Sequence, residues 1–123
     1  MMAKILVVED DEGIAHLLRR LMTKKGHETI LASNGWDGLI QAQTQMPDLI
    51  FTDVRMPDLG GLELATFIKA DPLLKHIPLI ILSGTAYLLE ADSTLADEIL
   101  AKPFEINTVY GILERFLPQA THC

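Results

Sequence analysis

The sequence has one cysteine, no excess of positive charge and no long apolar run, and each shortage excludes a class of protein. The single cysteine, Cys123, cannot form an internal disulfide or a Cys-x-x-Cys metal site, so we expect a reducing compartment. No segment reaches the roughly 20 consecutive apolar residues of a membrane-spanning helix. The first residues also lack the apolar core and cleavage site of a secretory signal. We therefore expect a cytoplasmic protein.

Positive charge is scarce in this chain. Seventeen Asp and Glu residues oppose ten Lys and Arg residues, which gives a formal net charge of −7. Nucleic-acid binders and proteins held on anionic lipid need a basic patch, which this balance disfavours. We expect neither nucleic acid nor a membrane among the direct partners.

The length and composition favour one globular domain. The chain has 123 residues, of which 49% are hydrophobic. A domain of this size buries about two-thirds of its unfolded surface and needs no metal or disulfide to hold a core. We expect a single domain over residues 1–123, with a core from about 4 to 117 and a short tail at 118–123.

The apolar pattern alternates between two periods. Continuous runs rich in Ile, Leu and Val are typical of strands covered on both faces, and apolar residues three and four apart indicate helices. The expected strands are residues 5–8, 29–32, 49–51, 79–82 and 99–101. The expected helices lie around residues 14–22, 39–42, 62–68 and 106–113, with a poorly patterned one at 86–95.

This alternation predicts an α/β fold with five βα units. Strands that alternate with helices form a parallel sheet with right-handed crossovers and helices on both faces. Five such strands commonly take the order 2-1-3-4-5. We therefore expect a flavodoxin-like, doubly wound (βα)5 three-layer sandwich.

Polar groups follow four of the five expected strands. They are Glu9 and Asp10, then Asp53, Ser83 and Lys102. In a 2-1-3-4-5 sheet the carboxyl ends of these strands meet at one crevice. Taken singly, an acid after a strand often only caps the next helix, and a lone Asp, Ser or Lys is usually solvated surface. A chemically matched group on four strands favours a site.

The charges of this set suggest its chemistry. Glu9, Asp10 and Asp53 would place about −3 in one pocket, which is costly unless a cation offsets it. Mg²⁺ prefers carboxylates, water and phosphate oxygens, and Lys102 supplies a further positive charge. Such an arrangement suits a phosphoryl group, and a carboxylate is itself a possible nucleophile. Asp53 is the best placed candidate.

Four segments together resemble the receiver domain of bacterial two-component response regulators. They are ILVVEDDE at 5–12, DLIFTDVRMPDLGGLEL at 48–64, PLIILSG at 78–84 and AKPF at 101–104. The resemblance spans about residues 4–117. It implies a phosphorelay module, without an output domain in this chain, that turns over no small-molecule substrate and catalyses only its own phosphorylation and dephosphorylation. The implied partners are a sensor histidine kinase or phosphotransfer protein and a downstream protein or output domain, and the chain would be a monomer or a weak homodimer.

The resemblance also implies a role for each site residue. Asp53 corresponds to the phosphoacceptor, which takes phosphate from a histidine of the kinase. Ser83 corresponds to the hydroxyl that turns toward the phosphoryl group, and Lys102 to the lysine that pairs with it. The bond from Lys102 to Pro103 would be cis.

The same resemblance implies a set of Mg²⁺ ligands. Asp10 and Asp53 would each supply a carboxylate oxygen, and Glu9 would act through water. The backbone carbonyl of Arg55 would be a further protein ligand.

Three features depart from the family pattern. Ile99 stands where the family often has Tyr or Phe, so the switch would be muted or use other groups. The 19 positions from Ser83 to Lys102 are short for the family, which predicts a short or distorted fourth helix. Gly60-Gly61 replaces the more common Asp-Gly, and we expect this to change only a turn.

Three other classes compete with this interpretation. A haloacid-dehalogenase-type phosphatase or phosphotransferase also uses an Asp nucleophile with Mg²⁺, but Asp53-Val54-Arg55 lacks its second acid. A flavodoxin-like nucleotide binder would need a phosphate loop where this chain has Glu9 and Asp10. An interaction module that had lost the chemistry would not need the full polar set.

Overall fold

The computed structural model describes residues 3–56, 58–84 and 96–117, and all five expected strands form. They make one parallel sheet in the order β2-β1-β3-β4-β5, as the sequence predicts. The expected helix at 86–95 lies outside the described residues. In chain order the elements are β1 (Lys4–Val8), α1 (Glu12–Lys24), β2 (Glu28–Ala32), α2 (Gly35–Gln45), β3 (Leu49–Asp53), α3 (Gly61–Ala70), β4 (Leu79–Gly84), β5 (Glu98–Lys102) and α4 (Ile106–Phe116).

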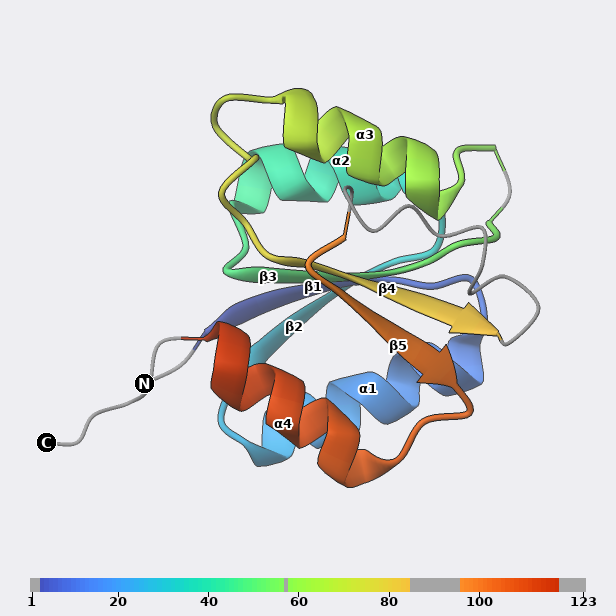
Figure 1. Cartoon of the computed structure of the whole chain (residues 1–123), viewed down its shortest axis with the longest axis vertical. Coiled ribbons are helices and arrows are strands. Elements are labelled where there is room, and N and C mark those ends of the chain that lie inside the picture. The colour runs from blue at the N-terminus through green and yellow to red at the C-terminus, as the bar shows by residue number, and fades with distance from the viewer. Residues whose placement is uncertain (1–2, 57, 85–95, 118–123) are drawn as a thin grey trace, which may run out of the picture.

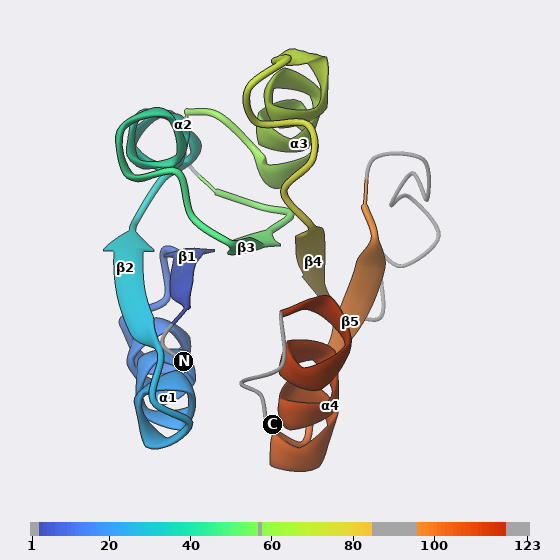
Figure 2. The ribbon, with the colours of Figure 1, turned by 90° about the vertical axis from the view of Figure 1, so that its left-hand side faces the viewer.

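The helices cover the sheet as two layers. Helices α1 and α4 lie on one face, and α2 and α3 lie on the other (Figures 1 and 2). Each layer closes its own apolar core, so the sheet is buried on both faces. This burial explains why the strands read as continuous apolar runs in the sequence.

Residues along each strand alternate between the two cores. In β1, Ile5 and Val7 join the core under α1 and α4, whereas Leu6 and Val8 join the core under α2 and α3. Phe51 of β3 is fully buried on the α1 side. Because successive side chains of a strand point to opposite faces, this alternation also sets the direction of the residues that follow β1.

Helix α1 shows how the sequence fixes the ends of an element. The Asp11 side chain accepts a hydrogen bond from the Ile14 backbone N–H at 3.1 Å and caps the N-terminus. At the other end Gly26 has a φ of 84°, where a side chain would be strained. The backbone N–H groups of Gly26 and His27 bond to Thr23 and Met22, which completes a Schellman cap.

The connection from β3 to α3 holds the helix against the phosphoacceptor candidate. A Cβ atom at Gly61 would overlap the backbone carbonyl oxygen of Asp53. The Gly61 N–H also donates to the Val54 carbonyl at 2.9 Å. Gly61, which the Gly-Gly and Asp-Gly patterns share, thus permits a close approach that no larger residue allows. The expected effect of Gly60 on the turn stays a prediction.

Candidate phosphoacceptor site

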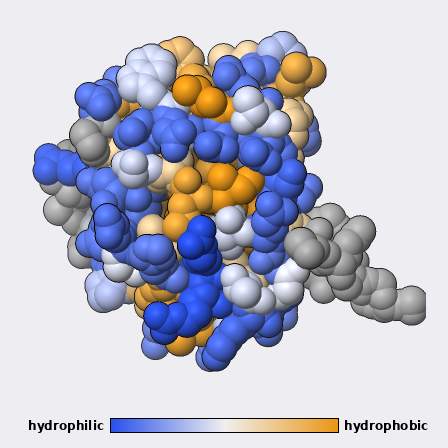
Figure 3. All heavy atoms as spheres, turned by 180° about the vertical axis from the view of Figure 1, so that it is seen from behind, coloured by the Kyte–Doolittle hydropathy of each residue, from blue (hydrophilic) through white to orange (hydrophobic). Residues whose placement is uncertain are grey.

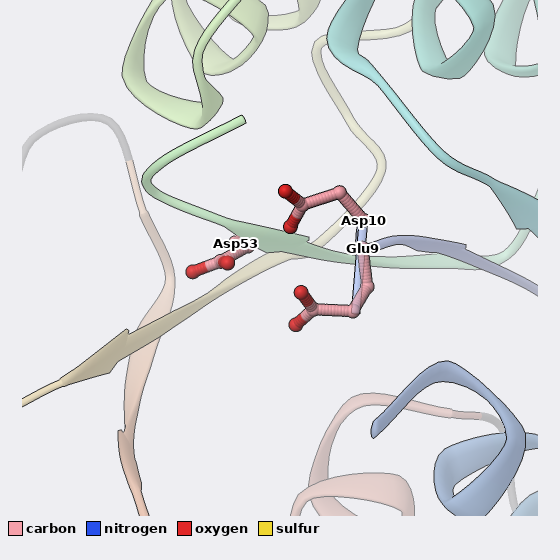
Figure 4. Close-up of side chains that lie close together, drawn as sticks. All are labelled: Glu9, Asp10 and Asp53. Carbon is pink, nitrogen blue, oxygen red and sulfur yellow. The ribbon is translucent and has the colours of Figure 1, made fainter. Parts of the chain in front are cut away.

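Three carboxylates converge at the carboxyl edge of the sheet. Glu9 and Asp10 follow β1, and Asp53 is the last residue of β3, the neighbouring strand. Figure 4 shows Asp10 above and Glu9 below the strand ends, with the Asp53 carboxyl group at a height between them. One oxygen from each lies within 4.8 Å of the others, which is close enough to share a metal ion. Three hard oxygen donors are the kind of ligand that Mg²⁺ prefers.

Lys102 bridges two of these acids from β5, at the opposite end of the chain. Its Nζ atom lies 3.0 Å from Glu9 Oε1 and 3.2 Å from Asp53 Oδ2. Burial acts to lower the pKa of Lys102, but the hydrogen bonds and charges of Glu9 and Asp53 outweigh it and hold this pKa above its ordinary value. Lys102 therefore stays charged beside the acids.

Glu9 and Asp10 are neighbours in sequence but occupy different surroundings. The Glu9 side chain is fully buried, and its Oε2 atom accepts from the Asp11 backbone N–H at 3.1 Å. Burial raises the pKa of Glu9 to about 7, against the opposing effect of Lys102. Asp10 is exposed. Only Asp10 and Asp53 thus present oxygens that an incoming ion reaches directly.

Asp53 is held by two contacts and remains partly exposed. Its Oδ1 atom accepts from the Val54 backbone N–H at 2.8 Å, and its Oδ2 atom faces Lys102. These contacts fix the orientation of the carboxylate without covering it. An oriented, accessible carboxylate beside an ammonium group has the geometry required of a nucleophile for phosphorus.

Ser83 lies at the same edge of the sheet, and its hydroxyl is bonded to the backbone. It is fully buried near the end of β4, and its hydroxyl donates to the Gly84 carbonyl at 3.0 Å. In the register of the sheet, Ser83 pairs with Ala101, next to Lys102. The hydroxyl must give up its bond to Gly84 before it donates to another acceptor.

An open cleft adjoins the acids, and only part of its lining is predictable from the sequence. Its volume is about 450 Å³, and it extends from Asp10 along the connection between β3 and α3. Arg55 lies in its wall, where its backbone was expected to take part. Asp58 and Glu63 also line the cleft and had not been singled out. The spacing of Asp58 and Glu63 in the sequence does not predict this position. They reach the cleft because the β3–α3 connection folds back, with Gly61 packed against the Asp53 backbone.

Two further expectations concern β5. The Lys102–Pro103 peptide bond is cis, as the resemblance implied. Ile99 is partly buried and packs against the core under α2 and α3, opposite Ile81 of β4. Its side chain thus behaves as an ordinary apolar residue of a strand. None of the described helices is both long enough and apolar enough to cross a membrane.

Known proteins share this fold and sequence pattern. The chain is 31% identical to the polar-differentiation response regulator DivK of Brucella anthropi over 98% of its own length and the whole of that protein. The chemotaxis response regulator CheY4 of Vibrio cholerae superposes with a TM-score of 0.85 at 30% identity, covering 95% of this chain and 100% of that one. The receiver domain of the sensor histidine kinase PA1611 from Pseudomonas aeruginosa gives 0.84 at 27% identity, over 94% and 98% of the two chains, and holds a magnesium ion in its active-site cleft.

The family comparison agrees with these individual matches. Residues 5–114 match the model of the response regulator receiver domain, and this range contains β2 to β5, all of β1 but its first residue, and Glu9, Asp10, Asp53 and Lys102. A phosphatase of the dehalogenase type is not favoured by these matches. The chain belongs to the receiver-domain family of two-component response regulators, and it is a phosphoacceptor module of signal transduction.

Proposed function

We propose that Asp53 is the residue that carries the phosphoryl group, received from a histidine kinase or a phosphotransfer protein. The observation that carries this assignment is the bridge from Lys102 to both Glu9 and Asp53. It leaves Asp53 as the carboxylate that is at once oriented, partly exposed and paired with a cation. No ion pair joins Asp10 to a cation within residues 3–56, 58–84 and 96–117, and Glu9 is buried.

The transfer step needs only a donor and the Asp53 carboxylate. An Asp53 oxygen attacks phosphorus, a P–O bond forms, and the P–N bond to the donor imidazole breaks with its electron pair. The leaving nitrogen takes a proton from water. Lys102 stays charged and attracts the phosphoryl oxygens as their charge shifts.

The acid cluster fits Mg²⁺, which would be held by Asp10, Asp53 and the Arg55 backbone carbonyl, with Glu9 acting through water. Bound there, Mg²⁺ would neutralise charge on the phosphoryl oxygens. The chain's own residues do the rest: Asp53 supplies the nucleophile, and Lys102 orients it. The Ser83 hydroxyl leaves the Gly84 carbonyl and donates to a phosphoryl oxygen.

Partners and location follow from this role. The donor is a histidine-phosphorylated protein, and the acceptor of the signal is a downstream protein or output domain that distinguishes the two states of Asp53. Phosphorylation takes this side chain from about −1 to nearly −2 and adds acceptor oxygens. We infer that the chain works in the cytoplasm and catalyses only the gain and loss of its own phosphate.

Intact-mass spectrometry with a small phosphodonor and Mg²⁺ tests the assignment. The native chain should gain one phosphate that hydroxylamine removes, and Asp53→Asn should gain none, because an amide is a poor nucleophile. Asp58→Asn is the matched control, since Asp58 lines the same cleft and its φ of 70° suits asparagine. Full phosphate uptake by Asp53→Asn, or loss of uptake by Asp58→Asn alone, would contradict the assignment.

A further inference from the structure

Three large apolar side chains lie exposed on the outer surfaces of α2 and α3. Trp36 is 50% exposed, Ile40 55% and Phe67 46%. Trp36 and Ile40 lie one turn apart on α2, and the Trp36 ring centroid lies 6.1 Å from that of Phe67 on α3. Figure 3 views the molecule from the side of α2, β2 and α1, and hydrophobic side chains reach the surface at its top among polar ones. Single exposed apolar residues are common, whereas a contiguous patch of them is typical of a binding surface.

Acids border this patch on both helices. On α2, Asp37 lies next to Trp36 in sequence and three residues before Ile40, which places it at the outer edge of the patch. On α3, the exposed Glu63 lies one turn before the phenylalanine, and the half-buried Asp71 ends the helix four positions after it. We call the three apolar side chains together with these three acids the α2–α3 face.

The acids of the α2–α3 face are not paired with bases of the same chain. In the part of the chain that the structure describes, no ion pair joins Asp37, Glu63 or Asp71 to Lys or Arg. Helix α2 contains no base, and the one base of α3, Lys69, pairs instead with Asp97 at 3.0 Å. The α2–α3 face is therefore an apolar strip with a negative border.

Two of these acids are already held in place by the backbone. The Oε1 atom of Glu63 accepts a hydrogen bond from the Gly60 N–H at 2.9 Å, and the Oδ1 atom of Asp71 accepts from the Leu73 N–H at 2.8 Å. Side chains that are ordered beforehand lose less conformational freedom on binding. The border is thus prepared to receive cations from outside the chain.

We propose that the α2–α3 face is the docking site of a basic amphipathic helix of a partner protein. Such a helix carries a stripe of apolar side chains flanked by Lys and Arg. Trp36 and Phe67 meet across two packed helices, so a third helix laid over them contacts both rings with its apolar stripe. Its flanking bases then pair with Asp37, Glu63 and Asp71.

The sign of the border selects this occupant over others. A second copy of this chain brings the same acids and the same net charge of −7, so the two faces repel one another. Anionic lipid and nucleic acid carry the same sign and are repelled as well. A basic partner is attracted both by the border and by the net charge of the whole chain.

The available area sets the strength of this docking. A fully buried aromatic side chain covers about 150–250 Å², so the three half-exposed side chains contribute roughly 300 Å². With a similar area from the partner, the contact remains below the roughly 1,200 Å² of a stable interface. Docking is therefore weak and reversible, and added salt weakens it further because the charges on the border are exposed.

Two synthetic peptides test the proposal on the unphosphorylated chain. Each has about 18 residues, or five helical turns, with the same leucine stripe at helical spacing. The flanking positions are lysine in one peptide and glutamate in the other. Trp36 is the only tryptophan of the chain, so a shift of its emission to shorter wavelength reports binding at the α2–α3 face. The lysine peptide should bind with micromolar affinity, at least tenfold more tightly than the glutamate peptide.

Two matched pairs of variants locate the binding site. Ile40→Gln should weaken the lysine peptide about tenfold, whereas Ile106→Gln, at a 50% exposed isoleucine of α4 on the other face of the sheet, should not. Glu63→Gln should weaken it about two- to fivefold, the range of an exposed ion pair. Glu105→Gln removes the same charge just before α4 and should leave binding unchanged. All four positions are exposed, so circular dichroism should show unchanged folding.

Several results would overturn the proposal. Equal binding of the two peptides would show that the acids do not select the partner. Lack of binding by the lysine peptide at millimolar concentration, or binding that Ile40→Gln leaves unchanged, would show that the α2–α3 face is not the site. Equal effects of Glu63→Gln and Glu105→Gln would mean that only net charge matters. A shift of Trp36 emission with protein concentration alone would assign the face to a second copy instead.

Discussion

Glu9 and Asp10 differ by one position in the chain, yet they create two unlike halves of the same site. Glu9 faces the α1 side, is buried and is bonded to Lys102, whereas Asp10 is exposed and lines the open cleft. We call them the closed half (Glu9 and Lys102) and the open half (Asp10 and the cleft). Asp53 lies between the two and contacts Lys102. In the proposed function, the closed half sets charge and stability, and the open half receives ions and phosphate.

The largest effect that separates the halves concerns Mg²⁺ affinity. Asp10→Asn removes a charged ligand from the open half without disturbing a buried contact. We expect the dissociation constant for Mg²⁺ to rise at least tenfold, about 1.4 kcal/mol, with the thermal midpoint of the metal-free chain nearly unchanged. Calorimetric titration measures the first and thermal unfolding the second. An unchanged Mg²⁺ titration would mean that Asp10 is not a ligand.

A change in the closed half should instead alter how the free energy of unfolding depends on pH. Because burial raises the pKa of Glu9 from 4.5 to about 7, folded Glu9 binds a proton that the unfolded chain has already lost. Its contribution to the free energy of unfolding is therefore largest below pH 4.5 and is lost as pH rises through about 7.

Denaturant unfolding of the metal-free chain at pH 5.5 and pH 8 measures this effect. The difference between native and Glu9→Gln chains should change by on the order of 1–2 kcal/mol over this interval, with the native chain losing more stability at the higher pH. Burial also lowers the pKa of His27, so the contribution of His27 to the free energy of unfolding is lost as pH falls, the opposite direction from Glu9. Both chains contain His27, so its contribution cancels in the comparison with Glu9→Gln. Equal pH profiles for the two chains would contradict a raised pKa at Glu9.

A smaller effect is expected at Ile99, which lies outside both halves. Ile99→Ala should cost about 1 kcal/mol of unfolding free energy, because the side chain is only partly buried. We expect amide shift changes on binding a phosphoryl mimic to persist across residues 84–95 in this variant. Our hypothesis is that the output runs mainly through the connection after Ser83, and not through residue 99. Loss of those changes, with the mimic still bound, would show that Ile99 does the work of the family's aromatic residue.

The smallest effect on the metal should come from Lys102→Ala. This change removes a competing cation from the closed half, so Mg²⁺ should bind with equal or slightly higher affinity while the response to phosphate is impaired. Mg²⁺ titration and phosphate-dependent amide shifts measure the two properties on one sample. A large loss of Mg²⁺ affinity in Lys102→Ala would contradict the assignment of Mg²⁺ binding to the open half alone.

Much of this arrangement was predictable from local pattern. The apolar runs gave the strands and the strand order placed Glu9, Asp10, Asp53 and Lys102 at one edge, because parallel strands align their carboxyl ends. The unequal burial of Glu9 and Asp10 was also within reach. Continuing the alternation of β1 sends Glu9 to the side of Ile5 and Val7 and Asp10 to the other side.

Other features depend on contacts that no local pattern encodes. The cleft lining by Asp58 and Glu63 follows from the fold of the β3–α3 connection, which is set by the fit of Gly61 against Asp53. The direction of the Ser83 hydroxyl depends on one side-chain rotation. Asp97 shows the same limit, because it accepts from both Lys69 and the Leu79 backbone N–H across long stretches of chain.

The bridge between Lys102 and Glu9 also has a consequence for the order of folding. The two residues are 93 positions apart, and β5 is an edge strand that pairs only with β4. Contacts of such long sequence separation form late, because a long loop must close before they can be made. During synthesis, a chain that has assembled β1 through β4 holds Glu9 and Asp53 without their cation. Under the proposed roles of Asp53 and Lys102, the site is therefore complete only when the last strand docks.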